Sequence, residues 1–86
     1  MAPIKGSTRV PEHKRWRCQN CRFTNSMEQI HCSQPRCGVR RDQGAHALTF
    51  NDLRIGELLT VFADGSEHWV YDEDTLTAIR MLAAAG

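Results

Sequence analysis

The sequence predicts a small α+β fold, and three observations lead to this prediction. Four cysteines gather within 20 residues of the N-terminal half, two β-rich runs flank an Asp-Gly turn in the C-terminal half, and an amphipathic helical pattern ends the chain. We expect two short β-hairpin turns that carry the cysteines, then a small β-hairpin or meander, then a C-terminal helix. A chain of 86 residues buries only roughly 60% of its unfolded surface, so a fold of this size often needs an additional staple.

The cysteines are the candidates for that staple. They follow the pattern Cys-x2-Cys-x10-Cys-x4-Cys, formed by Cys18, Cys21, Cys32 and Cys37. A Cys-x2-Cys turn presents two thiolates to one metal ion, and a second pair completes the tetrahedral S4 set that Zn²⁺ accepts. The pattern therefore predicts a closed, structural zinc site between two zinc knuckles. The second pair is spaced by four residues instead of two, and His31, next to Cys32, is an alternative ligand.

The same cysteines fit two other chemistries. Two disulfides would require an oxidising compartment, whereas residues 1–17 are polar and basic, contain Pro3 and Pro11, and lack the apolar core of a signal peptide. A redox Cys-x2-Cys motif would require a strand and a helix around Cys18, where the sequence is typical of a turn. Zinc is favoured over both, and it places the protein in an intracellular, reducing compartment. The sequence contains no apolar run of about eighteen residues, so no transmembrane helix is predicted.

Composition divides the chain into three segments. Residues 1–12 are expected to form a flexible basic arm, residues 13–41 the zinc finger, and residues 42–86 an acidic unit of β-hairpin and helix. Residues 1–41 carry nine Lys and Arg against two Glu, a net charge of +7, whereas residues 42–86 carry two Arg against eight acids, a net charge of −6. A basic half on a metal-bound finger is typical of a surface for nucleic acid. Neutralisation of the basic half by the acidic half of the same molecule is an equal alternative.

The elements of the acidic segment follow from local patterns. Residues 58–62 and 67–71 are β-rich and flank Asp64-Gly65, which predicts a hairpin, and residues 47–50 are a candidate third strand. Residues 53–62 also fit a helical face, and the hairpin is favoured. Residues 72–86 predict a helix with acidic residues at its start and an apolar stripe that we expect to pack on the sheet rather than on a partner, formed by Leu76, Ile79, Leu82 and Ala83.

Residues 16–40 resemble the Ran-binding-protein type of zinc finger. The family pattern is Trp-x-Cys-x2-Cys-x3-Asn-x6-Cys-x2-Cys, often followed by a glycine and an arginine. The chain matches this pattern, apart from the longer last spacing, at Trp16, Cys18, Cys21, Asn25, Cys32, Cys37, Gly38 and Arg40. Physical reasoning assigns structural roles to three of these residues. Trp16 is expected to shield the metal site, Asn25 to hydrogen-bond across the loop, and Gly38 to permit a tight turn.

The resemblance implies two binding functions. One branch of the family binds single-stranded RNA through an aromatic residue after the Asn and a pair of arginines. The residues after Asn25 lack both features, so only sequence-tolerant contacts to phosphates are expected. The other branch binds ubiquitin through a Thr-Phe pair after the second cysteine. Here the pair is Arg22-Phe23, and Phe23 either anchors a protein partner or packs under the loop.

No enzymatic activity is expected, because four thiolates leave no open position for water and no nucleophile–base pair or phosphate-binding glycine loop is recognisable. The first hypothesis is a zinc-finger module that binds RNA or a ribonucleoprotein surface. A protein-binding finger, for ubiquitin or an assembly partner, is the second, and a structural subunit of a larger complex is the third. The candidate partner contacts are Trp16, Arg17, Arg22, Phe23, Arg36, Arg40 and Arg41.

Overall fold

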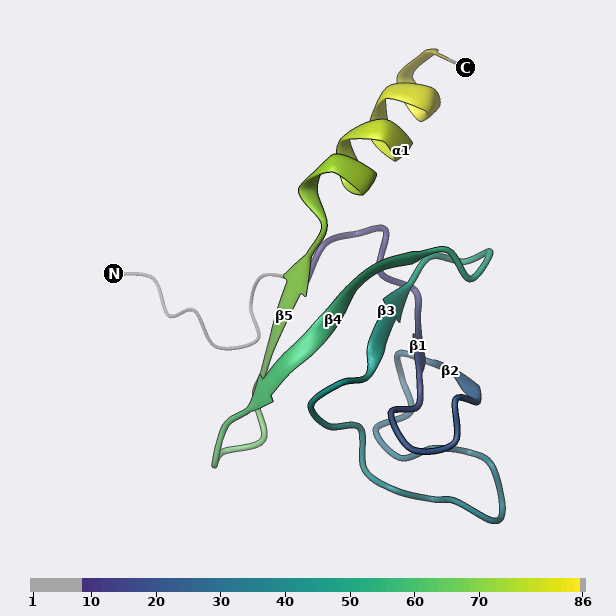
Figure 1. Ribbon diagram of the computed structural model, residues 1–86, viewed down its shortest axis with the longest axis vertical. Helices are drawn as coiled ribbons and strands as arrows, with labels where there is room; N and C mark the ends of the chain where they lie inside the picture. Colours follow the sequence, from purple (N-terminus) through teal and green to yellow (C-terminus); the bar gives the residue numbers. More distant parts are fainter. Residues whose placement is uncertain (1–8, 86) are drawn as a thin grey trace.

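One antiparallel sheet and a C-terminal helix make up the computed structural model of this protein, which describes residues 9–85 (Figure 1). Neighbouring strands are antiparallel, in the order β2-β1-β3-β4-β5. The predicted α+β class is therefore confirmed, and most of the predicted basic arm, residues 1–8, lies outside the described residues. The elements are β1 (Arg15–Arg17), β2 (Thr24–Ser26), β3 (His46–Leu48), β4 (Arg54–Val61), β5 (Glu67–Tyr71) and α1 (Glu73–Ala85).

The two cysteine pairs lie on different local structures. The first pair lies in the turn of the β1–β2 hairpin, where the Cys18 amide donates to the Phe23 carbonyl at 2.9 Å. The second pair lies on a loop that is closed by an isolated bridge between His31 and Arg40. The prediction of two β-hairpin knuckles is not confirmed, because the second pair lies in the loop between β2 and β3, where an isolated bridge stands in place of a hairpin. Its longer spacing contains Pro35, which lacks an amide donor and interrupts strand pairing.

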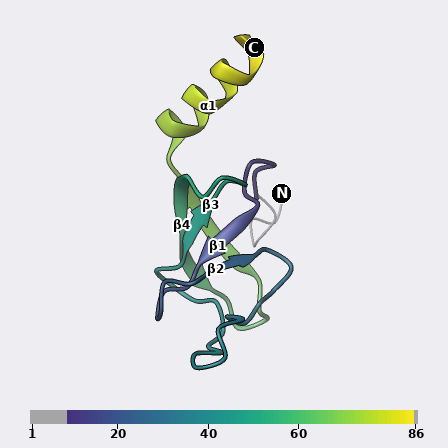
Figure 2. The same cartoon turned by 90° about the vertical axis from the view of Figure 1, so that its right-hand side faces the viewer.

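Strand β1 joins the cysteine-containing segment to the rest of the sheet. It pairs with β2 on one side and with β3 on the other, so that Trp16 faces Asn25 across one edge and Ala47 across the other. Figure 2 shows β1 between these neighbours. The sequence segments 13–41 and 42–86 thus contribute to one sheet.

The β4–β5 hairpin forms around the predicted Asp-Gly turn. Gly65 adopts φ +89°, and the Phe62 amide donates to the Ser66 carbonyl at 2.8 Å. The alternative helix over residues 53–62 is wrong, since residues 54–61 form β4. The predicted third strand over 47–50 forms as His46–Leu48, and the chain then turns, with the Asp52 amide donating to the Thr49 carbonyl.

Helix α1 forms as predicted but packs differently from the prediction. Asp72 caps its start, since the Asp72 carboxylate accepts a hydrogen bond from the Thr75 hydroxyl at 2.6 Å, and this bond lowers the pKa of Asp72. Leu76 is buried, whereas Leu82 is 74% exposed, so the predicted packing of the whole stripe on the sheet is wrong. The reason is the connection: α1 begins two residues after β5 ends, and no loop folds it back over the sheet (Figures 1 and 2).

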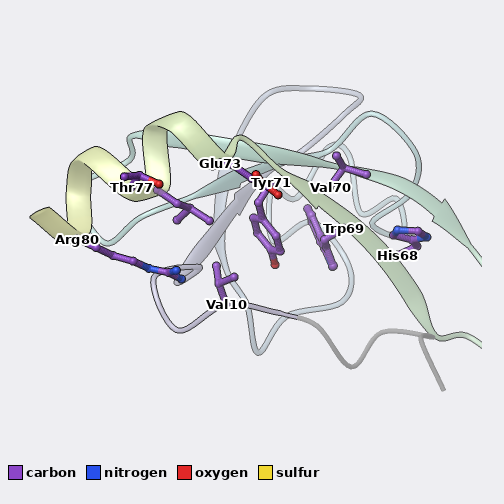
Figure 3. A pocket seen from close by; sticks show the side chains of 9 residues that line it. Val10, His68, Trp69, Val70, Tyr71, Glu73, Thr77 and Arg80 are labelled. Carbon is purple, nitrogen blue, oxygen red and sulfur yellow. The ribbon is translucent and has the colours of Figure 1, made fainter. Parts of the chain in front are cut away.

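A groove of about 520 Å³ lies beside the start of α1, between the helix and β5 (Figure 3). Val10 and Tyr71 line it on one side and Thr77 and Arg80 on the other. Arg80 forms an ion pair with Glu12 at 2.8 Å, which connects the helix to the segment that precedes β1. No helix in the described part of the chain is long and apolar enough to cross a membrane.

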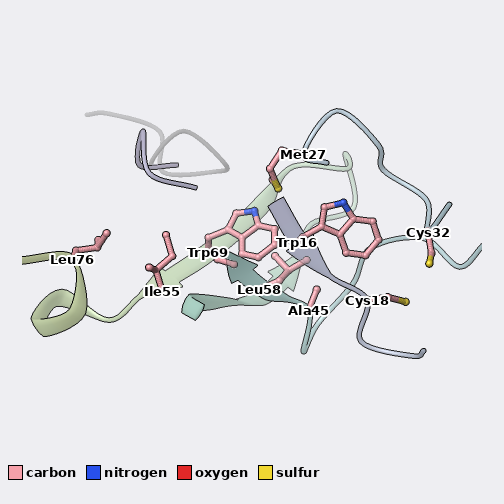
Figure 4. Close-up of a cluster of buried hydrophobic side chains, with 10 residues drawn as sticks. Trp16, Cys18, Met27, Cys32, Ala45, Ile55, Leu58, Trp69 and Leu76 are labelled. Atoms are coloured by element: carbon pink, nitrogen blue, oxygen red, sulfur yellow. The ribbon is translucent and has the colours of Figure 1, made fainter. Parts of the chain in front are cut away.

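The core is continuous between the two halves of the sheet (Figure 4). It extends from two cysteines to the first turn of α1 and comprises Trp16, Cys18, Met27, Cys32, Ala45, Ala47, Ile55, Leu58, Trp69 and Leu76. His13 is buried against it, with its ring centroid 4.4 Å from that of Trp69 in an edge-on arrangement and its Nδ1 at 2.8 Å from the Tyr71 hydroxyl. Burial, assisted by nearby arginines, lowers the pKa of His13 to about 4, so the imidazole is neutral at pH 7.

Candidate metal centre

The four cysteine sulfurs form one compact cluster. All lie within 4.8 Å of one another, with Sγ–Sγ distances of 3.5 Å between Cys21 and Cys32 and 3.7 Å between Cys18 and Cys37. A tetrahedral site with metal–sulfur bonds of about 2.3 Å places its sulfurs about 3.8 Å apart. The cysteines are free thiols, so this arrangement of sulfurs fits a metal ion rather than disulfides. Zn²⁺ is the typical occupant of such an S4 site.

Asn20 provides hydrogen bonds to the sulfurs of this cluster. Its backbone amide lies 3.3 Å from the Cys18 sulfur, and its side-chain amide lies 3.3 Å from the Cys37 sulfur. The side-chain bond is the main reason why the pKa of Cys37 is lowered to about 6. A lower thiol pKa favours the thiolate, which is the form that binds metal. Sequence reasoning missed Asn20, although its position inside the Cys-x2-Cys turn was the available signal.

His31, the alternative ligand, does not belong to this cluster. Its side chain is exposed, and the metal-ligating group found among residues 9–85 consists of cysteines alone. The backbone amides of Cys18, Cys32 and Cys37 each donate a hydrogen bond to a carbonyl of a nearby residue. These bonds hold three of the four predicted ligands in place.

Trp16 lies inside the protein and not on its surface. It is fully buried, and its indole nitrogen donates to the carbonyls of Ser26 at 3.0 Å and Gln29 at 2.8 Å. Figure 4 shows its ring between the cysteines and Trp69. The expected contact of Trp16 with a partner does not fit this position, because its only polar side-chain atom is engaged and its ring is enclosed in the core.

Asn25 and Gly38 occupy the places expected of structural residues. The buried Asn25 side chain accepts hydrogen bonds from the Ser33 amide at 2.9 Å and the Ser33 hydroxyl at 2.8 Å, and it donates to the Phe23 carbonyl at 3.2 Å. It thereby ties the loop of the first cysteine pair to that of the second. Gly38 adopts φ +68°, which a glycine accepts without strain.

Arg40 and Arg41 bind Glu67 of the same chain. Arg41 is only 5% exposed, and its Nε and Nη2 donate to the two carboxylate oxygens of Glu67 at 2.8 and 3.0 Å. Its guanidinium also lies 5.4 Å from the Trp16 ring centroid and 5.8 Å from that of Trp69. Arg40 Nη1 donates to Glu67 at 2.9 Å.

The partner-contact prediction therefore fails for Arg41, which is buried, and Arg40 is engaged inside the molecule. Burial alone would raise the pKa of Glu67, but the hydrogen bonds from Arg41 and Arg40 outweigh it and lower that pKa. For these two arginines, the alternative of internal neutralisation holds. Sequence reasoning missed Glu67, because nothing in its strand pattern indicated a partner 26 residues away.

The remaining candidate contacts lie at the surface around the cysteine cluster. Arg22 and Arg36 are exposed, Arg17 is half-buried, and Phe23 is 42% exposed. Within residues 9–85, none of these three arginines forms an ion pair, whereas Arg15, Arg54 and Arg80 each pair with a carboxylate. Three of the cations that lack an ion pair in this part of the chain thus lie next to cysteines of the cluster, whereas Arg9 and Lys14, which also lack one, line a different hollow, to which no cysteine contributes.

Comparisons of the chain with protein-family models, with curated proteins and with solved structures find no match. The resemblance to the Ran-binding-protein type of zinc finger stays a prediction that rests on residues 16–40. The geometry of the site itself therefore defines its chemistry: a cluster of four thiols able to hold a metal ion lies next to surface cations and an exposed aromatic ring.

Proposed function

We propose that this protein is a non-enzymatic zinc-finger module that binds single-stranded RNA through the surface beside its metal centre. The observation that carries the proposal is that Arg17, Arg22 and Arg36, each next to a cysteine of the cluster in the sequence, form no ion pair in the described part of the chain, and that Phe23, which follows Arg22, is exposed. A ribonucleoprotein surface would present the same chemistry. The proposal places the protein in a reducing, intracellular compartment, where thiolates persist.

The metal has a structural role in this proposal. Four cysteine ligands saturate Zn²⁺ and leave no position for water or substrate. Residues 27–44 form a long loop that contains no named strand. The sulfurs of Cys32 and Cys37 on this loop lie beside those of Cys18 and Cys21 in the β1–β2 turn, so a shared metal ion would connect the loop to the turn. The ion therefore acts by holding the loop and its arginines in place.

Single-stranded nucleic acid suits the available side chains. Arginines contact phosphates irrespective of sequence, and an exposed aromatic ring stacks on any base. Base stacking contributes roughly 1–3 kcal/mol per base. The combination predicts sequence-tolerant binding with a strong dependence on salt.

The test is the affinity of the zinc-loaded protein for a labelled single-stranded RNA of mixed sequence, measured by fluorescence anisotropy over a series of salt concentrations. The double variant Arg22→Asn, Arg36→Gln should bind at least roughly tenfold more weakly at low salt. It should also reduce the slope of log K against log salt by about 1.4, since each lost phosphate contact on a single strand removes about 0.7. Asn is chosen at position 22 because Arg22 has φ +68°, a conformation that Asn tolerates.

The matched control is the double variant Arg15→Gln, Arg80→Gln, which removes the same charge from arginines that are ion-paired and do not line the hollow beside Cys18. Its affinity should stay near that of the unaltered protein. Equal losses in both variants would mean that net charge alone attracts RNA. An unaltered protein whose affinity does not change with salt would contradict the proposal.

Phe23 supports a second candidate function, the binding of a protein such as ubiquitin. Phe23 is 42% exposed, so its side chain is accessible to a partner without unfolding. Phe23→Ala should abolish binding of a protein partner and leave zinc content unchanged. Titration of the protein with ubiquitin, followed by amide NMR, distinguishes this function from RNA binding, and failure of both leaves the structural-subunit hypothesis.

A further inference from the structure

A small hollow lies next to the first cysteine pair. It has a volume of about 60 Å³ and is lined by Arg17, Cys18, Gln19, Arg22, Gly44 and His46. This volume is several times the roughly 10–15 Å³ that one water molecule requires. The β1–β3 register places Arg17 directly opposite His46, and the turn that follows β1 brings Arg22 to the same place.

The charges around the hollow are predominantly positive. Among residues 9–85, no carboxylate lines it, and both of its arginines lack an ion pair. Burial lowers the pKa of His46, and Arg54, Arg17 and Arg22 lower it further, while Glu57 opposes them. The Glu57 carboxylate is itself paired with Arg54 at 2.9 Å. An anion in the hollow would thus meet cations that no described carboxylate pairs with.

Some hydrogen-bonding groups of the residues that line the hollow have partners within the protein, and others have none. The Nδ1 atom of His46 is buried and has no hydrogen-bond partner among the described residues. By contrast, the amides of Cys18 and Gly44 already donate to carbonyls, and the Gln19 side chain bonds to Arg40 and Asp42. The groups without a hydrogen bond among the described residues include the two guanidinium groups, the Gln19 backbone amide and the imidazole. A buried polar atom without a partner is unfavourable.

We propose that this hollow binds one phosphodiester group of the RNA backbone, with Arg17, Arg22 and His46 as its ligands. The proposal rests on the proposed function and assigns it a specific phosphate site. A phosphodiester is favoured because the next residue after Arg22 is the exposed Phe23, so a strand that stacks a base on Phe23 brings a neighbouring phosphate to Arg22.

The experiment uses two probes on the zinc-loaded protein at constant ionic strength. Dimethyl phosphate, a phosphodiester without a base, is titrated while the His46 ring and the Nε–H signals of Arg17 and Arg22 are followed by NMR. We expect saturable shifts of these three signals, with a dissociation constant on the order of millimolar. Inorganic phosphate serves as the alternative anion, and it should bind no more tightly than the diester.

The second probe is single-stranded RNA. Its binding is compared for two protein variants, each altered at one residue of β1. Arg17→Gln should weaken binding roughly tenfold and reduce the salt slope by about 0.7. Arg15→Gln is the matched control: Arg15 also lies on β1, but it pairs with Asp52 and does not line the hollow, so binding should change less than about twofold. Zinc content is measured for each variant, because Arg17 precedes a cysteine of the cluster.

The outcomes separate this inference from the proposed function. If RNA binds but dimethyl phosphate leaves the His46 ring unchanged and the two variants behave alike, the hollow is not a phosphate site, while RNA binding stands. If inorganic phosphate shifts the His46 ring and RNA does not bind, the nucleic-acid assignment is overturned together with the proposed function. If Arg17→Gln alone weakens RNA binding and abolishes the dimethyl phosphate shifts, the inference is supported.

Discussion

The metal-binding segment, residues 13–41, and the sheet–helix segment, residues 42–85, differ in the share of their arginines that form ion pairs. In the sheet–helix segment, both arginines are paired, Arg54 with Glu57 and Arg80 with Glu12. In the metal-binding segment, Arg17, Arg22 and Arg36 form no ion pair with any residue from 9 to 85. The other three arginines of this segment, Arg15, Arg40 and Arg41, pair with Asp52 and Glu67 of the sheet–helix segment. Arg17, Arg22 and Arg36 therefore remain available to a ligand.

The two segments also differ in how they obtain their stability. The sheet–helix segment has a regular hairpin, β4–β5, whereas the metal-binding segment has two strands of three residues and long loops. The two are joined through the β1–β3 pairing and through Arg41, which is enclosed by Trp16, Trp69 and Glu67. We therefore expect the two segments to fold as one unit. Four experiments test this expectation and the contribution of each segment to stability.

Removal of the metal should have the largest effect. Structural Zn²⁺ contributes roughly 10–16 kcal/mol in zinc-finger peptides, as much as the whole stability of most domains. Because Trp16 belongs to the shared core, we expect chelation, or Cys32→Ser, to remove hydrogen-exchange protection from β4 and β5 as well as from β1. Amide exchange measured by NMR with and without chelator provides the test. Persistent protection of β4 and β5 would show that the sheet–helix segment folds alone.

Glu67→Gln should have the next largest effect. It leaves the buried Arg41 guanidinium without its counterion, and breaking a buried pair destabilises a protein by about 3–5 kcal/mol. The control is Glu57→Gln, which breaks the exposed pair with Arg54 and should lower stability by no more than about 1 kcal/mol. Urea unfolding of the zinc-loaded variants measures both values. Similar values would mean that Arg41 does not join the two segments.

Acidification should destabilise the protein through His13. The pKa of His13 is about 4 in the folded state, against 6.5 for an unperturbed histidine, so the unfolded chain binds the proton more tightly. Stability from this group is complete above pH 6.5 and is lost as the pH falls towards 4, by roughly 2–3 kcal/mol.

His13→Phe removes the titrating group but keeps a ring in the core. The difference in unfolding free energy between pH 7 and pH 5 should be smaller in this variant than in the unaltered protein. Protonation of the cysteines affects both proteins alike, so their difference isolates His13. Equal pH dependence would contradict the burial of a neutral imidazole.

The smallest effect is expected at the end of α1. Leu82→Ala should change stability by no more than about 0.5 kcal/mol, because the side chain is 74% exposed. Leu76→Ala, on the same helix but buried, should cost about 2–3 kcal/mol. Thermal unfolding of both variants gives the comparison. A large loss for Leu82→Ala would mean that the helix packs along its whole length.

Local patterns in the sequence were sufficient for several elements. The spacing of Cys18, Cys21, Cys32 and Cys37 predicts a metal-binding cluster because two tight turns can present thiolates to one point. Asp64-Gly65 predicts the hairpin because glycine accepts φ +89° there. The acidic start and apolar period predict α1 because helix capping and periodicity are properties of neighbouring residues.

Contacts between distant residues could not be derived in this way. Nothing local indicates that β1 pairs with β3, that Arg41 is enclosed by Trp16, Trp69 and Glu67, or that the end of α1 stays exposed. The hollow between Arg17 and His46 likewise exists only because these residues lie opposite each other on paired strands. Strand register and the burial of charge depend on the packing of the whole chain. Residue types along the sequence therefore specify the cysteine cluster and the turns, while the three-dimensional pairing of strands determines which arginines remain available to bind a ligand.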